Sequence, residues 1–336
     1  MTQADVALPK GPPRDWVPVL LVPALMLLAW PLVGSTTSWI TLTVAGLAMG
    51  MMIFVMASGL TLVFGLMDVL NFGHGAFIAF GAYVALIVAR PLAGWIDAPV
   101  PLLNGAVFVL MILVAMAVAG VGGLVFERVL VRPVYGQHLR QILVTMGGLI
   151  VAQQLIIVLW GPVQVTLMVP AAFRGALVLG NVAIERYRLL AILVGLVVLA
   201  VMLLVLNRTR LGLLIRAGVQ NREMVEALGY RVRRLFVGVF MAGSALSGLG
   251  GVMWALYREA LTPTMGLDVT VLVFIVVIIG GLGSVGGCFI GALLVALTAN
   301  YVGFLAPRVA AATNILLMVL VLLWRAQGLY PVVKRG

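Results

Sequence analysis

The chain has 336 residues, of which 64% are hydrophobic and only 9% are charged. A soluble globular domain has about 25% charged residues, so this composition excludes one and indicates a polytopic membrane protein. The net charge of +11 would suggest nucleic acid in a soluble protein, but the basic residues cluster beside apolar runs. Anionic lipid and membrane topology explain that arrangement better, so we expect no nucleic-acid partner.

Ten membrane-spanning helices are predicted, because about 20 apolar residues are needed to cross a bilayer. The first is interpreted as a retained helix rather than a signal peptide, since no small-residue cleavage signal ends it. The apolar tract 268–303 is too long for one crossing and has glycines in its middle, so we predict two spans joined by a tight turn. The predicted spans are 16–33, 39–67, 74–90, 104–126, 141–160, 188–206, 235–257, two within 268–303, and 309–324.

The distribution of lysine and arginine sets the expected orientation, because these residues are enriched in cytoplasmic segments. With ten spans and the N-terminus inside, two basic residues lie before the first span, three between the fourth and fifth, seven within 207–234 and three in the C-terminal tail, which is 15 of the 21. We therefore expect both termini to be cytoplasmic. The whole chain, 1–336, is predicted to be a single transmembrane domain, with a small extracytoplasmic elaboration at 161–188.

The segment 207–234 is the only long charged interruption between apolar runs. Arg216 to Gly229 has helical spacing: Met224 and Leu228 are four residues apart, and Glu223 and Glu226 fall on the other side. We predict one short amphipathic helix under the bilayer. It is expected to end at Gly229, because glycine accepts the left-handed conformation found after helices.

A distinctive segment, Gly59 to Tyr83, contains Asp68, Asn71 and His74 three residues apart, so they would share one side of a helix or of its broken end. Ionisable groups at membrane depth are costly and usually face a cavity, which would place them near a substrate path or gate. Alternatively, Asn71 and His74 satisfy backbone groups at a helix break. The alternative is favoured for Asp68 and His74 as individual groups, while the break itself is expected to matter.

Small residues recur at every fourth position in two spans, a spacing that lets helix backbones approach closely in lipid. Leucine at Gly287 is therefore expected to cost assembly far more than alanine. Spacing alone leaves open whether Gly283 and Ser284 also line the substrate path or gate. The two sets are Gly243, Ser247 and Gly251, and Gly283, Gly287 and Gly291.

A possible internal repeat links 59–83 with the tract from 268 onward, since each has a span, a glycine-rich turn and a second span. Transporters often contain such duplications, with the substrate path at the repeat interface.

No catalytic or metal-binding constellation is recognisable, since the chain has two distant histidines and the single cysteine Cys288. The sequence has no GxxxxGK[ST] motif, so ATP cannot bind through a P-loop. Asp68 is the only acid well inside an apolar run, whereas a secondary transporter more often carries several buried carboxylates. A secondary transporter or channel remains an alternative, followed by an intramembrane enzyme.

Three segments, GLTLVFGLMDVLNFGHGAFIAFGAYVA, IRAGVQNREMVEALGY and GGLGSVGGCFIGALL, resemble the permease subunits of branched-chain amino-acid-type ABC importers. The resemblance implies about ten helices, as in the cobalamin importer, and a bacterial inner-membrane location. It implies a paired permease subunit, identical or homologous, a periplasmic solute-binding protein and two cytoplasmic ATPases that hold ATP and Mg. The solute would be a branched-chain amino acid, or alternatively urea, a short amide or another small solute.

In this family the loop between the sixth and seventh spans docks on the ATPases, which implies that role for 207–234. The chain departs from the family pattern at Val225, where a small residue is usual, and at Ala76, where an acidic residue often follows His-Gly. Arg216, Ala217, Asn221 and Gly229 match the pattern, and the remaining residues expected at the docking surface are Glu223, Met224, Glu226 and Leu228.

Overall fold

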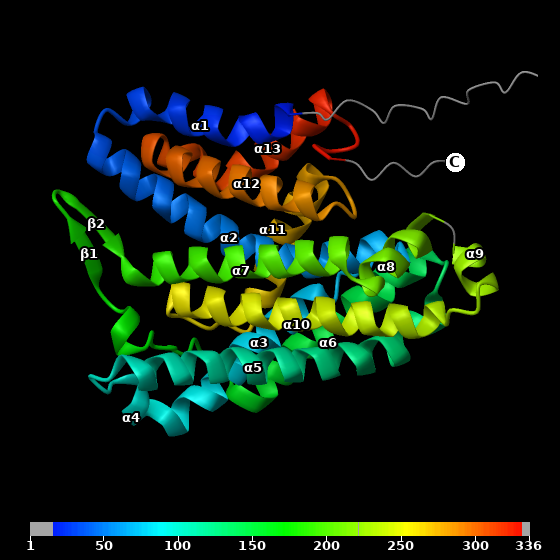
Figure 1. The fold of residues 1–336 in the computed structure, drawn as a ribbon. Helices are drawn as coiled ribbons and strands as arrows, with labels where there is room; N and C mark the ends of the chain where they lie inside the picture. The colour runs from blue at the N-terminus through cyan, green and yellow to red at the C-terminus, as the bar shows by residue number, and fades with distance from the viewer. Residues whose placement is uncertain (1–15, 221, 331–336) are drawn as a thin grey trace, which may run out of the picture.

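A computed structural model describes residues 16–220 and 222–330, apart from the side chains of residues 216, 219, 220, 222 and 223. Asn221 and the side chains of Arg216 and Glu223, all expected at the docking surface, therefore lie outside the described residues. The described chain is a bundle of helices with one small hairpin (Figure 1). The helices are α1 Val17–Val33, α2 Thr36–Met67, α3 His74–Ala89, α4 Ala93–Ile96, α5 Pro101–Phe126, α6 His138–Trp160, α7 Arg186–Arg208, α8 Arg210–Gln220, α9 Arg222–Ala227, α10 Val232–Arg258, α11 Met265–Gly280, α12 Val285–Leu305 and α13 Ala310–Trp324, and the strands are β1 Ala176–Leu179 and β2 Val182–Glu185.

Each of the ten predicted spans corresponds to an apolar helix, in the predicted order. Within the described residues, eight helices are long and apolar enough to cross a membrane, and α1 and α11 are shorter apolar helices. The tract 268–303 forms α11 and α12 with a turn between them, as predicted. The prediction of an all-α polytopic membrane protein is confirmed.

The two ends of the bundle differ in what they carry. Helix α1 begins and α13 ends at the same end as α8 and α9, while β1 and β2 lie at the opposite end (Figure 1). This is the arrangement that an even number of crossings requires. The elaboration expected at 161–188 contains the antiparallel hairpin β1–β2, and Val165 pairs with Leu261 beside it.

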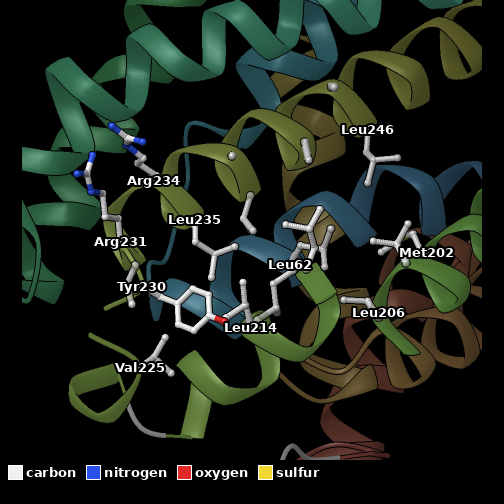
Figure 2. A pocket seen from close by; sticks show the side chains of 18 of the residues that line it. Leu62, Met202, Leu206, Leu214, Val225, Tyr230, Arg231, Arg234, Leu235 and Leu246 are labelled. Carbon is white, nitrogen blue, oxygen red and sulfur yellow. The ribbon is translucent and has the colours of Figure 1, made fainter. Parts of the chain in front are cut away.

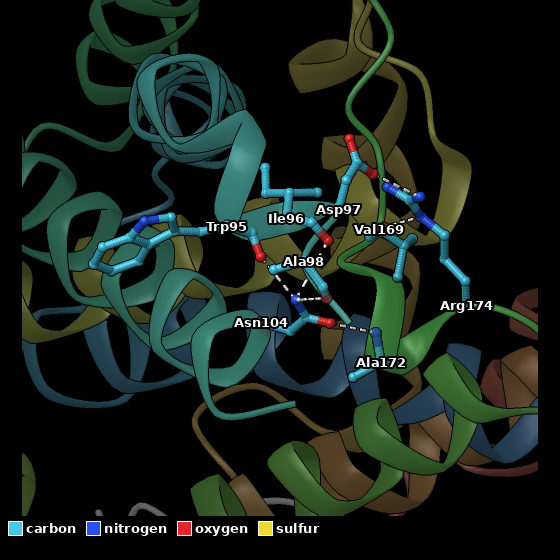
Figure 3. A network of polar contacts seen from close by, with 8 residues as sticks. All are labelled: Trp95, Ile96, Asp97, Ala98, Asn104, Val169, Ala172 and Arg174. Carbon is cyan, nitrogen blue, oxygen red and sulfur yellow. Dashed lines mark hydrogen bonds and ion pairs between the residues drawn. The ribbon is translucent and has the colours of Figure 1, made fainter. Parts of the chain in front are cut away.

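Polar contacts fix the hairpin end of the molecule (Figure 3). The Asn104 side chain, buried at the start of α5, accepts a hydrogen bond from the backbone N–H of Ala172. Arg174 forms an ion pair with Asp97 at 2.8 Å and donates to the backbone carbonyl of Val169. Asn104 Nδ2 also donates to the carbonyls of Trp95, Ile96 and Ala98. The long loop is therefore anchored to α4 and α5 through the buried Asn104 amide and the Arg174–Asp97 ion pair.

Close backbone contacts at glycine hold the centre of the bundle, where α2 packs against α7, α10 and α12. A methyl group at Gly243 would overlap the carbonyl oxygen of Gly59, and one at Gly251 would overlap that of Ile78. A methyl group at Gly287 would similarly overlap the carbonyl oxygen of Gly280, and one at Gly291 would press on the carbonyl oxygen of Val276. These positions require small residues because helix backbones touch there.

One expectation about the glycine sets is wrong. Gly283 does not extend the helical set of Gly287 and Gly291, because it lies in the turn before α12 with φ of 81°. At Gly287 even alanine is expected to be costly, because its first side-chain carbon would overlap the backbone of Gly280; the larger cost expected for leucine stays a prediction.

We predict that Gly287→Ala lowers the stability of the purified protein by about 2 kcal/mol or more, since overpacking a well-filled site forces the backbone to shift. Gly286→Ala is the matched control, because nothing lies within 4 Å of a methyl group at that position. The measurement is the melting temperature in detergent. Equal melting temperatures for the two variants would contradict the α11–α12 contact.

Candidate functional site

The connection between α7 and α10 is shorter than expected. Helix α7 continues to Arg208 and α10 begins at Val232, so the connecting segment is 209–231 rather than 207–234. The structure describes helix on both sides of residue 221, as α8 and α9, which agrees with the predicted helical segment from Arg216 to Gly229; residue 221 itself lies outside the described residues.

Helix α8 begins at a side-chain cap and packs inward. The Thr209 hydroxyl accepts a hydrogen bond from the backbone N–H of Gly212 at 3.2 Å, which satisfies one free donor of the first turn. Leu214, Ile215 and Ala217 pack against a buried apolar cluster that contains Leu66, Val69, Phe77, Val225 and Val232. Ala217 therefore supports the segment from within.

The end of α9 is a Schellman motif. The N–H of Tyr230 donates to the carbonyl of Val225, and the N–H of Gly229 donates to that of Glu226. Gly229 has φ of 86°, a conformation that L side chains rarely adopt. The predicted helix end at Gly229 is therefore confirmed, and α9 has a fixed geometry at its exit.

Helix α9 turns its larger apolar side chains away from the bundle. Val225 is only 4% exposed, whereas Met224 is 61% and Leu228 70% exposed. Glu226 is also exposed on this short helix. Large exposed apolar side chains rimmed by polar groups are typical of a protein contact surface. Sequence spacing missed Val225 as the residue that attaches α9 to the core.

The helical structure is interrupted between α2 and α3. Asp68, Asn71 and His74 lie at three different places along this helix break. Asp68 ends α2 in a left-handed conformation with φ of 53° and is exposed, whereas His74 begins α3 and is buried. The three residues therefore do not share one side of a helix. At the broken end, Asn71 and His74 are both buried while Asp68 is exposed, because helical periodicity applies only while the helix is continuous.

His74 joins three helices. Its Nε2 lies 2.8 Å from the carbonyl oxygen of Met56 in α2 and 2.7 Å from the hydroxyl oxygen of Ser247 in α10. The Ser247 hydroxyl in turn donates to the Gly243 carbonyl at 2.9 Å. This geometry fits an N–H group shared between two acceptors, which ties the start of α3 into the centre of the bundle.

Asn71 is different, because its side chain is buried without a partner. It is 1% exposed, and neither its amide nitrogen nor its oxygen forms a hydrogen bond within the described residues. The next residue, Phe72, is held by a 3.2 Å bond from its N–H to the Thr145 hydroxyl and by stacking on Phe274. Leaving such an amide unpaired costs about 1–3 kcal/mol, so it requires an explanation other than stability.

A second break, the turn 281–284, adjoins the first. A methyl group at Gly65 would lie 3.1 Å from the Cα of Gly283, so the end of α2 touches this turn. The Ser284 hydroxyl accepts from the N–H of Gly287 at 3.1 Å, which makes Ser284 the N-cap of α12. The N–H groups of Leu329 and Tyr330 donate to the carbonyls of Ile279 and Gly280, so the segment after α13 covers the end of α11.

Comparison with known proteins places the sequence of this chain in a known family. The family described as the branched-chain amino acid transport system permease component matches residues 42–324. The high-affinity branched-chain amino acid transport permease BraD of Pseudomonas aeruginosa is 29% identical over 295 residues, covering 85% of this chain and 94% of the relative. LivH of Escherichia coli K12 is 26% identical over 297 residues, covering 84% and 92%.

A more distant relative is the probable branched-chain amino acid transport permease LivH of Methanocaldococcus jannaschii. It is 22% identical over 267 residues, covering 75% of this chain and 78% of the relative. No solved structure matches the chain significantly.

We predict that Asn71→Leu keeps or raises the melting temperature, because a leucine of similar shape removes the cost of an unpaired buried amide. His74→Leu should instead lower the stability by about 1–3 kcal/mol, because it removes the contacts to Met56 and Ser247. Both variants are measured by thermal unfolding in detergent. Equal losses in the two variants would show that the Asn71 amide is paired in the bilayer.

Proposed function

The chain belongs to the branched-chain amino acid transport permease family, and from this we propose that it carries branched-chain or related amino acids across the bacterial inner membrane. The family match spans most of the chain, and the apolar bundle supports a multi-pass membrane protein. As a permease subunit of an ATP-binding cassette importer, it would form half of the translocation pathway. The match over 42–324 is the observation that carries this proposal.

The assembly we propose follows from the same family membership. A second permease subunit, identical or homologous, would complete the pathway, and a periplasmic solute-binding protein would deliver the solute. Two cytoplasmic ATPases would bind ATP and Mg and supply the energy. Within the family, urea, a short amide or another small solute is the alternative cargo, and no observation on the described residues favours an ATP-independent carrier or a channel.

We propose that α9 is the helix that engages an ATPase. Met224 and Leu228 would enter a groove of the partner, while Glu223 and Glu226, and by the family pattern Arg216 and Asn221, would make contacts around it. Helix-in-groove recognition concentrates affinity in a few apolar anchors, and these two side chains are already turned outward. The Schellman motif at Gly229 supports this role, because it holds α9 in one orientation for docking.

Movement of α9 would reach the pathway through the buried apolar cluster. Val225 packs in the same cluster as Leu66, Val69 and Phe77, which flank the break between α2 and α3. A close-packed cluster transmits displacement rather than absorbing it. The break holds the unpartnered Asn71 amide, which we assign to the substrate pathway or gate together with Asp68, His74, Gly283 and Ser284. The amide would be satisfied when the pathway opens or the solute passes.

We predict that Leu228→Ala weakens co-purification of the ATPases and abolishes uptake, while membrane insertion is kept. Losing an apolar anchor costs upwards of about 1–2 kcal/mol of binding. Leu102→Ala is the matched control, because Leu102 is also highly exposed but begins α5 at the hairpin end of the bundle. The measurements are pull-down of the ATPases and substrate-stimulated ATP hydrolysis in lipid. Full pull-down and stimulation with Leu228→Ala would overturn the assignment of α9.

We also predict that both chain ends and α9 face the cytoplasm. In a Cys288→Ala background, single cysteines at the exposed positions Ser35 and Arg258 should react with an impermeant thiol reagent added from outside. A cysteine at the exposed position Ala227 should react only after the membrane is opened. Labelling of position 227 in sealed cells would mean that the topology is inverted.

A further inference from the structure

Four arginines surround a cavity of about 490 Å³ at the end of the bundle that carries α8 and α9. Two come from the segment after α5, which continues as a π-helical turn over Glu127–Val131, and two from the start of α10. π-Helical turns are frequent at functional sites. The cavity is lined by Glu127, Arg128, Arg132, Arg233, Arg234 and Val237.

The charges in this cavity do not balance. Glu127 is fully buried; one carboxylate oxygen accepts from the Tyr135 hydroxyl at 2.5 Å, and the other has no hydrogen-bond partner within the described residues. The ion pairs found in the described part of the chain involve none of the four arginines. One carboxylate against four guanidinium groups leaves an excess of positive charge, which favours an anionic ligand.

An apolar groove of about 820 Å³ adjoins the cavity and lies between α7 and α10 (Figure 2). Its floor includes Leu62 of α2 and Met116 of α5. The α10 side of the groove is kept open by small residues, namely Gly238, Ala242 and Ala245. Arg234 lines both the groove and the cavity, so an elongated ligand can reach from one into the other.

We propose that the groove and the arginine cavity together bind one anionic phospholipid. Helices α7 and α10 are apolar enough to span a membrane, so the part of the groove between these two helices would lie at bilayer depth, where a soluble partner cannot enter. An acyl chain matches its apolar lining, and a lipid phosphate matches the guanidinium groups, which bind phosphate in a bidentate manner. Basic pockets between membrane helices are suited to anionic headgroups.

The bound lipid would contact the connection between α7 and α10. Val225, Tyr230 and Arg231 line the same groove, and Val225 attaches α9 to the core. Lipid occupancy would therefore stabilise the position of α9 relative to α10. This inference does not depend on which solute the protein carries.

The test uses the purified full-length chain in detergent and native mass spectrometry with palmitoyl-oleoyl phosphatidylglycerol or phosphatidylcholine. Wild-type protein should bind phosphatidylglycerol at least about tenfold more tightly, since each basic residue near an anionic lipid contributes favourably. Arg233→Gln combined with Arg234→Gln should remove that preference. Ala242→Phe should weaken the binding of both lipids, because the phenylalanine side chain would fill the groove. Arg258→Gln, at the opposite end of α10, is the control and should change nothing.

Several outcomes would overturn the proposal. They are equal binding of the two lipids to wild-type protein, unchanged phosphatidylglycerol binding in the double arginine variant, or unchanged binding in Ala242→Phe. Competition by inorganic phosphate as effective as that by the lipid would indicate a soluble-anion site instead. If the double arginine variant fails to fold, the single variant Arg234→Gln should reduce the preference for phosphatidylglycerol, and an unchanged preference in the folded single variant would contradict the headgroup site.

Discussion

Direct contact between helix backbones at glycine is the interaction on which this structure depends. Around α2, the backbone of Gly59 meets that of Gly243, and Gly46 and Gly50 sit against leucines of α12. In lipid, helices gain little from apolar contact alone, so close approach must supply the attraction. It also leaves no room for adjustment, because the touching atoms belong to backbones. The bundle thus has a rigid centre, and its freedom to change is concentrated where helices are interrupted.

Interrupted helices leave backbone hydrogen-bonding groups without helical partners, and neighbouring groups in this protein satisfy most of them. Helix ends inside a bilayer protein expose donors and acceptors that water cannot satisfy. At the two breaks these groups are covered by the left-handed turn at Asp68, the hydroxyl of Ser284 and the backbone after α13. The Asn71 amide is the exception. A buried group left unsatisfied beside well-capped neighbours marks the place where one packed state can give way to another.

Much of the fold follows from the sequence because hydrophobic length alone identifies spans, and glycine position identifies turns. The division of 268–303 into two helices and the end of α9 at Gly229 are of this kind. Features that need knowledge of neighbours could not be predicted. The grouping of Asp68, Asn71 and His74 relied on helical spacing across an expected break, and Val225 looked like a departure from a pattern until the cluster around Leu66 was known. The burial of Glu127 likewise depends on Tyr135 and on the start of α10, and no sequence pattern around Glu127 indicates that these groups contact it.

The hydrogen bonds from Leu329 and Tyr330 to the end of α11 bear on how the molecule is made. These residues are synthesised last among the described part of the chain, whereas Ile279 and Gly280 enter the membrane some fifty positions earlier along the sequence. Until translation passes residue 330, the last carbonyls of α11 have no such partners. The end of α11, which leads into the turn beside Gly65 and Gly283, is therefore covered only once residues 329 and 330 have been made.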